Sequence, residues 1–201
     1  MNKPIFDLVI VGVGGQGTLL ASKILGKLAM SQGLGVKVSE VHGMSQRGGS
    51  VITHVRIGES VNAPLVTLGG ADYLISFEAL EAVRAAAYLK PEGVVITNSQ
   101  RILPMPVITG AMQYPAEPLN DAALVGHTIE AANALALAVE AGSQKAVNLV
   151  LLGILSNHLP FADEDWKHAI ASSVPRSTMA VNIKAFEAGR ACVSTVNGQQ
   201  A

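Results

Sequence analysis

Three glycines that lie between an apolar run and a helical pattern are the first residues in this sequence that could do chemistry. Gly12, Gly14 and Gly17 satisfy the spacing G-x-G-x-x-G. Glycine in these places permits a tight turn, close approach of a phosphate to the backbone, and packing of the next helix on the strand. A helix beginning there also presents free N–H groups and the positive end of its dipole. The spacing favours a bound anion, and glycines used only for packing are the plainer alternative.

The residues inside this first loop bear on which ligand it would take. Gly15 and Gln16 complete the loop, and we count all of Gly12, Gly14, Gly15, Gln16 and Gly17 as candidate cofactor-binding residues. The long polar side chain of Gln16 weighs against a dinucleotide, because such sites usually have small or apolar residues there. Glu40 keeps NAD(P) or FAD open, since an acidic residue after the second strand can hold a ribose hydroxyl.

A second polar, glycine-rich loop follows at residues 42–50. Its candidate binding residues are Ser45, Gln46, Arg47, Gly48 and Gly49. The planar guanidinium of Arg47 suits a phosphate or a carboxylate, and the two glycines leave the backbone free to approach a ligand. The alternatives for Arg47 are a contact that orders the loop or a contact with a partner. Ser45 and Gln46 could bind a ligand, although capping the loop is the favoured role for both.

The other titratable residues carry weaker signals. The five histidines show no metal-ligand spacing, and Cys192 is the single cysteine. A chain with one cysteine cannot form an internal disulfide or hold an iron–sulfur cluster. Glu78 and Glu81 are expected to be solvated helix charges or partner contacts. We therefore assign no catalytic residue and no metal ligand to this chain.

Composition narrows the class of protein. The chain has 201 residues, of which 49% are hydrophobic and 14% charged, with a formal net charge of −1. The charge balance and the 4% of aromatic residues give no support to nucleic-acid binding. We expect no membrane span, because no uninterrupted apolar stretch approaches about 20 residues, and we expect a cytoplasmic location. A surface this poor in charge suggests that part of it is covered by a partner.

The apolar pattern predicts an α/β protein. An apolar run at residues 5–11, a helical pattern at 18–31 and a second run at 36–41 form a strand–helix–strand unit with parallel strands. The rest of the chain continues this alternation. We expect further strands at residues 51–57, 71–77, 94–97 and 107–113, and further helices at 78–89, 128–141, 145–155, 164–172 and 176–189.

These elements predict one domain rather than several. The expected fold is a single three-layer Rossmann-like sandwich with a mostly parallel sheet. We expect the domain to span residues 1–192 and to be followed by a polar tail at 193–201. No internal repeat and no linker divides it.

The two glycine loops together resemble a known family. The segments GVGGQG at residues 12–17 and SQRGG at 45–49 resemble the gamma domain of the pyruvate/2-ketoisovalerate ferredoxin oxidoreductase family. The stretch SEVHGMSQRGGSVITHV, which starts at Ser39, is most similar to the small (beta) subunit of indolepyruvate-type enzymes. The resemblance covers nearly the whole chain and is strongest over residues 7–98.

The resemblance implies a subunit that is not active alone. The family converts a 2-oxoacid to an acyl-CoA and carbon dioxide and reduces ferredoxin, with coenzyme A as co-substrate. Thiamine diphosphate, Mg²⁺ and the iron–sulfur clusters are then expected in a large partner subunit, because this chain has one cysteine and no Gly-Asp-Gly segment. The isolated small subunit could form a homodimer. The alternatives are a self-sufficient NAD(P)- or FAD-binding Rossmann oxidoreductase and a non-catalytic nucleotide-binding module.

Overall fold

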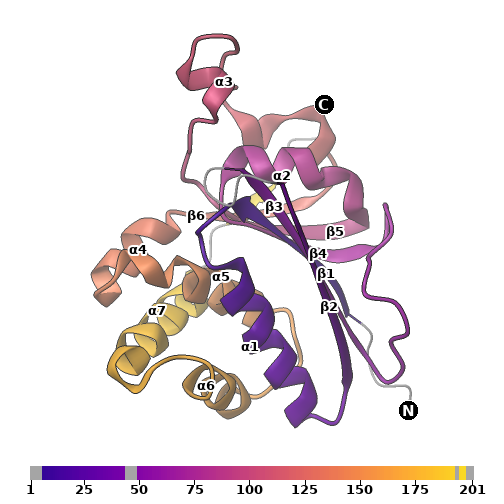
Figure 1. Cartoon of the computed structure of the whole chain (residues 1–201), viewed down its shortest axis with the longest axis vertical. Helices are drawn as coiled ribbons and strands as arrows, with labels where there is room; N and C mark the ends of the chain where they lie inside the picture. The colour runs from indigo at the N-terminus through magenta and orange to yellow at the C-terminus, as the bar shows by residue number, and fades with distance from the viewer. Residues whose placement is uncertain (1–5, 44–48, 193–194, 198–201) are drawn as a thin grey trace.

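The computed structural model describes residues 6–43, 49–192 and 195–197. Its strands form a single sheet in the order β2-β3-β1-β4-β5-β6-β7 (Figure 1). The strands are β1 Phe6–Val13, β2 Gly35–His42, β3 Ser50–Gly58, β4 Ala71–Ser76, β5 Leu89–Asn98, β6 Thr128–Ala132 and β7 Thr195–Asn197.

The directions of the strands confirm the prediction of a mostly parallel sheet. From β1 the sheet continues parallel through β4, β5 and β6. On its other side β1 pairs antiparallel with β3, which pairs antiparallel with β2. Strands β1 and β2 therefore run in the same direction, as expected, but β3 lies between them. The cause is local, because β2 and β3 are joined by a short loop and such neighbours pair antiparallel.

Helices cover both faces of the sheet and make the expected three layers (Figure 1). The alternating side chains of β1 show the division, since Leu8 and Ile10 belong to one core and Val9 and Val11 to the other. The first core lies under α1 Thr18–Ser31, α4 Ala134–Ala141, α5 Val147–Ser156, α6 Asp163–Ala171 and α7 Met179–Ala191, and the second under α2 Ala79–Ala85. Short 3₁₀ turns occupy Ala86–Tyr88, Pro118–Asn120, Ala122–Leu124, Gln144–Ala146 and Arg176–Thr178.

Helix α5 forms the centre of the thicker layer. All ten of its residues are buried. Helix α7 packs on it so closely that a Cβ atom on Gly153 would lie 2.1 Å from the carbonyl oxygen of Phe186. Glycine at this crossing lets the two backbones meet, which holds α5 against the sheet.

Two sequence predictions for the second half of the chain are wrong. The strand expected at 107–113 is instead a loop with the four-residue helix α3 Met105–Ile108. The helix expected at 128–141 is strand β6 followed by helix α4, which Asn133 caps by accepting a hydrogen bond from the Ala136 N–H. Pairing of β6 with β5 overrides the helical preference of its alanines, a tertiary effect that local pattern does not contain. Residues 195–197 of the expected tail add β7 to the sheet.

Ion pairs link neighbouring strands at the amino end of the sheet. Arg56 on β3 donates to Asp7 on β1, with Nε 2.8 Å from Oδ1. Lys90 on β5 pairs with Asp72 on β4, and Asp72 also accepts from the Asp7 backbone N–H at 2.7 Å. These charges link four strands at the end of the sheet opposite the glycine loops.

Candidate functional site

The first glycine loop lies where β1 ends, at the carboxyl end of the sheet. The two connections that leave this end go to opposite faces, since α1 packs on one core and α2 on the other. In open α/β sheets a crevice forms between the strands at such a point and is the usual place for a ligand. Gly17 ends the loop with φ of 93° as the N-cap of α1, and no side chain caps that helix. The first-turn N–H groups of α1 therefore face the crevice.

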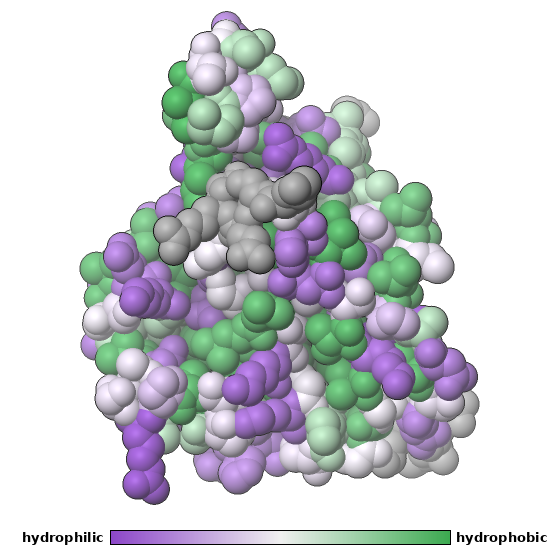
Figure 2. All heavy atoms as spheres, in the orientation of Figure 1, coloured by the Kyte–Doolittle hydropathy of each residue, from purple (hydrophilic) through white to green (hydrophobic). Residues whose placement is uncertain are grey.

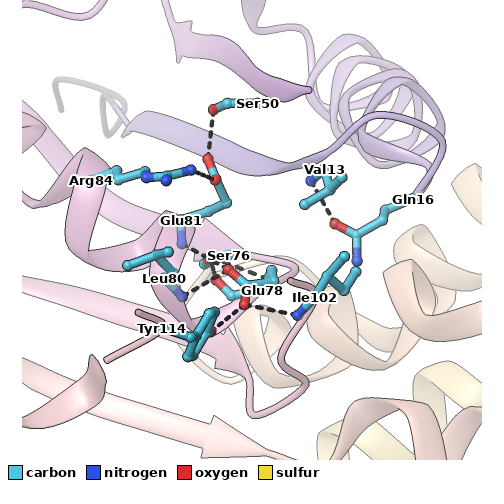
Figure 3. Close-up of polar contacts among 10 residues, drawn as sticks. All are labelled: Val13, Gln16, Ser50, Ser76, Glu78, Leu80, Glu81, Arg84, Ile102 and Tyr114. Atoms are coloured by element: carbon cyan, nitrogen blue, oxygen red, sulfur yellow. Dashed lines mark hydrogen bonds and ion pairs between the residues drawn. The ribbon is translucent and has the colours of Figure 1, made fainter. Parts of the chain in front are cut away.

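The side-chain amide of Gln16 forms hydrogen bonds with the protein backbone (Figure 3). Its Oε1 accepts from the Val13 N–H at 2.7 Å, and its Nε2 donates to the Phe77 carbonyl at 3.2 Å. A Cβ atom on Gly12 would lie 2.8 Å from that Oε1. The amide of Gln16 thus fixes the loop against the end of β4, and Gly12 leaves room for it.

Most of the second loop, including Ser45, Gln46, Arg47 and Gly48, lies outside the described residues. Gly49 is described, and its carbonyl oxygen accepts from the Gly14 N–H at 2.8 Å. This bond brings the end of the second loop onto the first loop. The two loops therefore meet at Gly49, while the anion-binding role of Arg47 stays a prediction.

Glu40 borders one side of the first loop. Its Oε2 accepts from Thr18 Oγ1 at 3.3 Å and from Thr53 Oγ1 at 3.1 Å. The carboxylate lies at the start of α1, where the helix dipole favours negative charge. It lines a hollow of about 400 Å³ together with Leu19 and His42. A phosphate on this side would meet a carboxylate, so this hollow suits a neutral group such as a hydroxyl.

The other side of the loop has the opposite polarity. A hollow of about 430 Å³ is bordered there by Gly15, Gly17, Gln100, Gln144 and Lys145, and no carboxylate lines it. The wall is completed by Asn148, a buried residue whose Nδ2 lies 3.5 Å from the Gly17 carbonyl. Sequence pattern alone does not identify Lys145 and Asn148 as neighbours of the first loop. The only local signal was an asparagine in the otherwise apolar run of α5.

Glu78 is buried, with 1% of its surface exposed, so the prediction of a solvated helix charge is wrong. Its Oε2 caps α2 by accepting from the N–H groups of Leu80 at 2.8 Å and Glu81 at 3.1 Å (Figure 3). Its Oε1 accepts from the Ile102 N–H at 3.1 Å and from the hydroxyl of Tyr114. Burial, followed by the bond to Glu78, raises the pKa of Tyr114. The phenol therefore stays a donor to this carboxylate.

Glu81 is also buried and joins the second loop to α2 (Figure 3). It accepts from Ser50 Oγ at 2.5 Å and pairs with Arg84 at 2.6 Å. A third hollow, of about 480 Å³, lies between Gly49, Ser50 and the residues 102–106. The carboxylates of α2 thus hold together the segments that surround this hollow.

The remaining titratable residues lie apart from these hollows, except His42, which borders the first. His54 is buried in β3 beside Tyr88, and burial lowers its pKa. His158 pairs with Glu130 at 3.0 Å. Over residues 6–43 and 49–192, no three histidine, cysteine or acidic side chains gather in a way that could hold a metal ion. Within the same part of the chain, no helix has both the length and the apolar character needed to cross a membrane.

Comparisons with known proteins agree with this architecture. A family model described as pyruvate ferredoxin/flavodoxin oxidoreductase matches residues 7–192. Indolepyruvate oxidoreductase subunit IorB of Thermococcus kodakarensis is 44% identical, over 92% of this chain and 94% of its own. The gamma subunit of a keto/oxoacid ferredoxin oxidoreductase from Geobacter sulfurreducens has a similar fold, with a TM-score of 0.68 at 24% identity over 92% of this chain and 95% of its own.

A longer enzyme contains the same fold as one part of a single chain. The structure is a 2-oxoglutarate:ferredoxin oxidoreductase from Magnetococcus marinus, with a TM-score of 0.66 at 18% identity. The match covers 94% of the present chain but only 31% of that protein. This fold therefore occurs both as a separate chain and beside further domains of one polypeptide.

Proposed function

This chain belongs to the pyruvate ferredoxin/flavodoxin oxidoreductase family, and from that premise we propose that it is the small subunit of an enzyme of the indolepyruvate type. The observation that carries the proposal is the 44% identity to an indolepyruvate oxidoreductase subunit along nearly the full length of both chains. The enzyme would oxidise an aryl pyruvate and form an acyl-CoA and carbon dioxide, with ferredoxin as electron acceptor.

The redox chemistry of this reaction would take place in a large partner subunit. Four thiolates usually hold an iron–sulfur cluster, and this chain has one cysteine. The clusters are therefore assigned to the partner. Thiamine diphosphate and Mg²⁺ are assigned there too, because this chain has no Gly-Asp-Gly segment, and thiamine diphosphate would stabilise the carbanion left by decarboxylation. The present chain would bind and orient a co-substrate at the interface.

Coenzyme A would bind at the carboxyl end of the sheet. A phosphate group would lie in the hollow bordered by Lys145, where the first-turn N–H groups of α1 and the glycine backbone face it. Arg47, on the loop that reaches Gly14 through Gly49, would supply a second cation. Gln16 would contribute by shaping this loop, since its amide is bonded to the backbone.

The first experiment is co-expression with the candidate large subunit, followed by anaerobic reduction of a viologen dye by indolepyruvate and coenzyme A. We expect co-purification and turnover that requires both chains. If the large subunit is folded and loaded with its clusters and yet shows neither association nor two-chain turnover, the proposal is wrong. Binding of NADH to the isolated chain would then favour the dinucleotide alternative.

A second experiment tests the coenzyme A site within the active complex. Lys145→Ala and Arg47→Ala should each raise the KM for coenzyme A about tenfold, the effect of roughly 1.4 kcal/mol of lost charge-assisted binding. The matched control is Lys23→Ala, which removes an exposed lysine on α1 away from the hollow. An unchanged KM in both variants would move coenzyme A elsewhere and leave the subunit assignment intact.

A further inference from the structure

A segment after β5 projects from the body of the protein with apolar side chains on its surface. We call residues 102–113 the arm. It carries α3 at its tip and extends away from the sheet (Figure 1) and beyond the rest of the molecular surface (Figure 2). The exposed fractions are 65% for Met105, 62% for Ile108 and 64% for Met112, and no residue of α3 is buried. No acidic or basic residue occurs in the arm.

The arm has a defined shape despite its lack of core contacts. Within it, the Val107 N–H donates to the Pro104 carbonyl at 2.9 Å and the Met112 N–H to the Pro106 carbonyl at 3.0 Å. The two ends of the arm meet at one buried carboxylate, because Ile102 and the adjacent Tyr114 both donate to Glu78 Oε1. A segment held in this way would lose little conformational entropy when a partner binds it.

We propose that the arm inserts into an uncharged, apolar groove of the large subunit, a role that rests on the proposed function. Large apolar side chains held away from the core are stabilised only when another surface covers them. The fold makes up 31% of a longer oxidoreductase chain, so it is built to lie beside larger domains.

The position of the arm points to the same partner. It follows β5 at the carboxyl end of the sheet and lines the hollow that Gly49 and Ser50 also border. Exposed Leu19 lines the hollow on the other side of the glycine loop. Twelve residues alone cover less than the roughly 800 Å² that each side of a stable interface buries. The interface therefore extends from the arm across Gly49 and the first glycine loop, which brings the proposed coenzyme A site to the large subunit.

The test compares two triple variants of the full-length small subunit that remove similar amounts of exposed apolar surface. The arm variant combines Met105→Ser, Ile108→Ser and Met112→Ser. The control variant combines Met30→Ser, Leu68→Ser and Val139→Ser, whose side chains are 67%, 69% and 56% exposed and lie outside the arm. Binding to the cluster-loaded large subunit is measured anaerobically by titration calorimetry, and thermal unfolding of each isolated variant is followed by circular dichroism.

We expect the arm variant to keep the Tm of the wild type and to raise the Kd for the large subunit at least tenfold, while the control variant stays within twofold. Equal Kd values for the arm variant and the wild type would overturn the docking role and leave the proposed function standing. If the arm variant no longer forms a homodimer but binds the large subunit as the wild type does, the docking role is wrong. The arm would then contact a second copy of the small subunit. Failure of the wild type to bind would contradict the proposed function and the docking role together.

Discussion

Both ends of the central sheet carry acidic side chains, but the two ends satisfy them in different ways. At the amino end, Asp7 and Asp72 meet the cations Arg56 and Lys90 of neighbouring strands. At the carboxyl end, Glu78 accepts instead from three backbone N–H groups and a phenol, although the neighbouring Glu81 pairs with Arg84. Pairs of partly exposed charges contribute little to stability, whereas a buried carboxylate with several neutral donors is costly to disturb.

The difference indicates what each end does. The amino-end pairs join strands that backbone hydrogen bonds already hold, so they add to an existing structure. Glu78 and Glu81 join segments that no sheet pairing connects, namely α2, the start of β3 and the arm. Acidic residues at the carboxyl end therefore give shape to the loops around the candidate site.

The largest loss of stability is expected from removing the carboxylate of Glu78. Glu78→Ala removes the acceptor that the N–H groups of Leu80 and Ile102 and the hydroxyl of Tyr114 share, and we expect a loss of about 3 kcal/mol in the free energy of unfolding. The matched variant at the amino end is Lys90→Ala, which should cost less than about 1 kcal/mol because the lysine is half exposed. Urea denaturation measures both. Similar losses would show that the two ends do not differ in this respect.

A smaller effect is expected from filling the space above Gly12. In Gly12→Ala the new Cβ atom would lie 2.8 Å from Gln16 Oε1 and 3.0 Å from Phe77 Cβ, so the amide of Gln16 must leave the Val13 N–H. We expect a loss of about 1–3 kcal/mol from overpacking. The control is Gly26→Ala inside α1, where the nearest atom is 4.0 Å away and alanine should stabilise the helix by roughly 0.5–1 kcal/mol. A neutral Gly12→Ala would mean that Gln16 does not fix the loop.

Local pattern was sufficient to predict most helices and strands in the first half of the chain, but not the position of β3 between β1 and β2. Helix α1 was expected at residues 18–31, the range that the structure gives, because its apolar spacing and its flanking glycines agree. The prediction of a single helix over residues 128–141 is wrong because this alanine-rich sequence is compatible with a helix throughout. The strand β6 exists there because β5 offers it a parallel edge, and the placement of that edge depends on residues far away in the chain.

The sequence likewise predicts only the local part of the candidate site. The five residues of the first glycine loop lie at the carboxyl end of β1, which their spacing implied. Lys145 and Asn148 reach this loop from more than a hundred residues further along the chain, as the separation of 131 residues between Gly17 and Asn148 shows. The burial of Glu78 likewise depends on the arm closing over it. Neither arrangement has a local signal, since the contacts form only when α5 and the arm pack.

The smallest expected effect concerns His54, an ionisable residue between the two ends of the sheet that has no charged partner among the described residues. Its Nδ1 faces the Val66 N–H at 3.4 Å, and burial lowers its pKa below the ordinary value of 6.5. As pH falls through about 6.5, the unfolded chain takes up a proton that the folded chain refuses, so His54 makes acid destabilising. Its contribution to stability is present above that pH and declines below it. In His54→Gln the fall in Tm from pH 7.5 to 5.5 should be less steep than in the wild type. Identical slopes for the wild type and His54→Gln would mean that His54 does not contribute to the acid sensitivity.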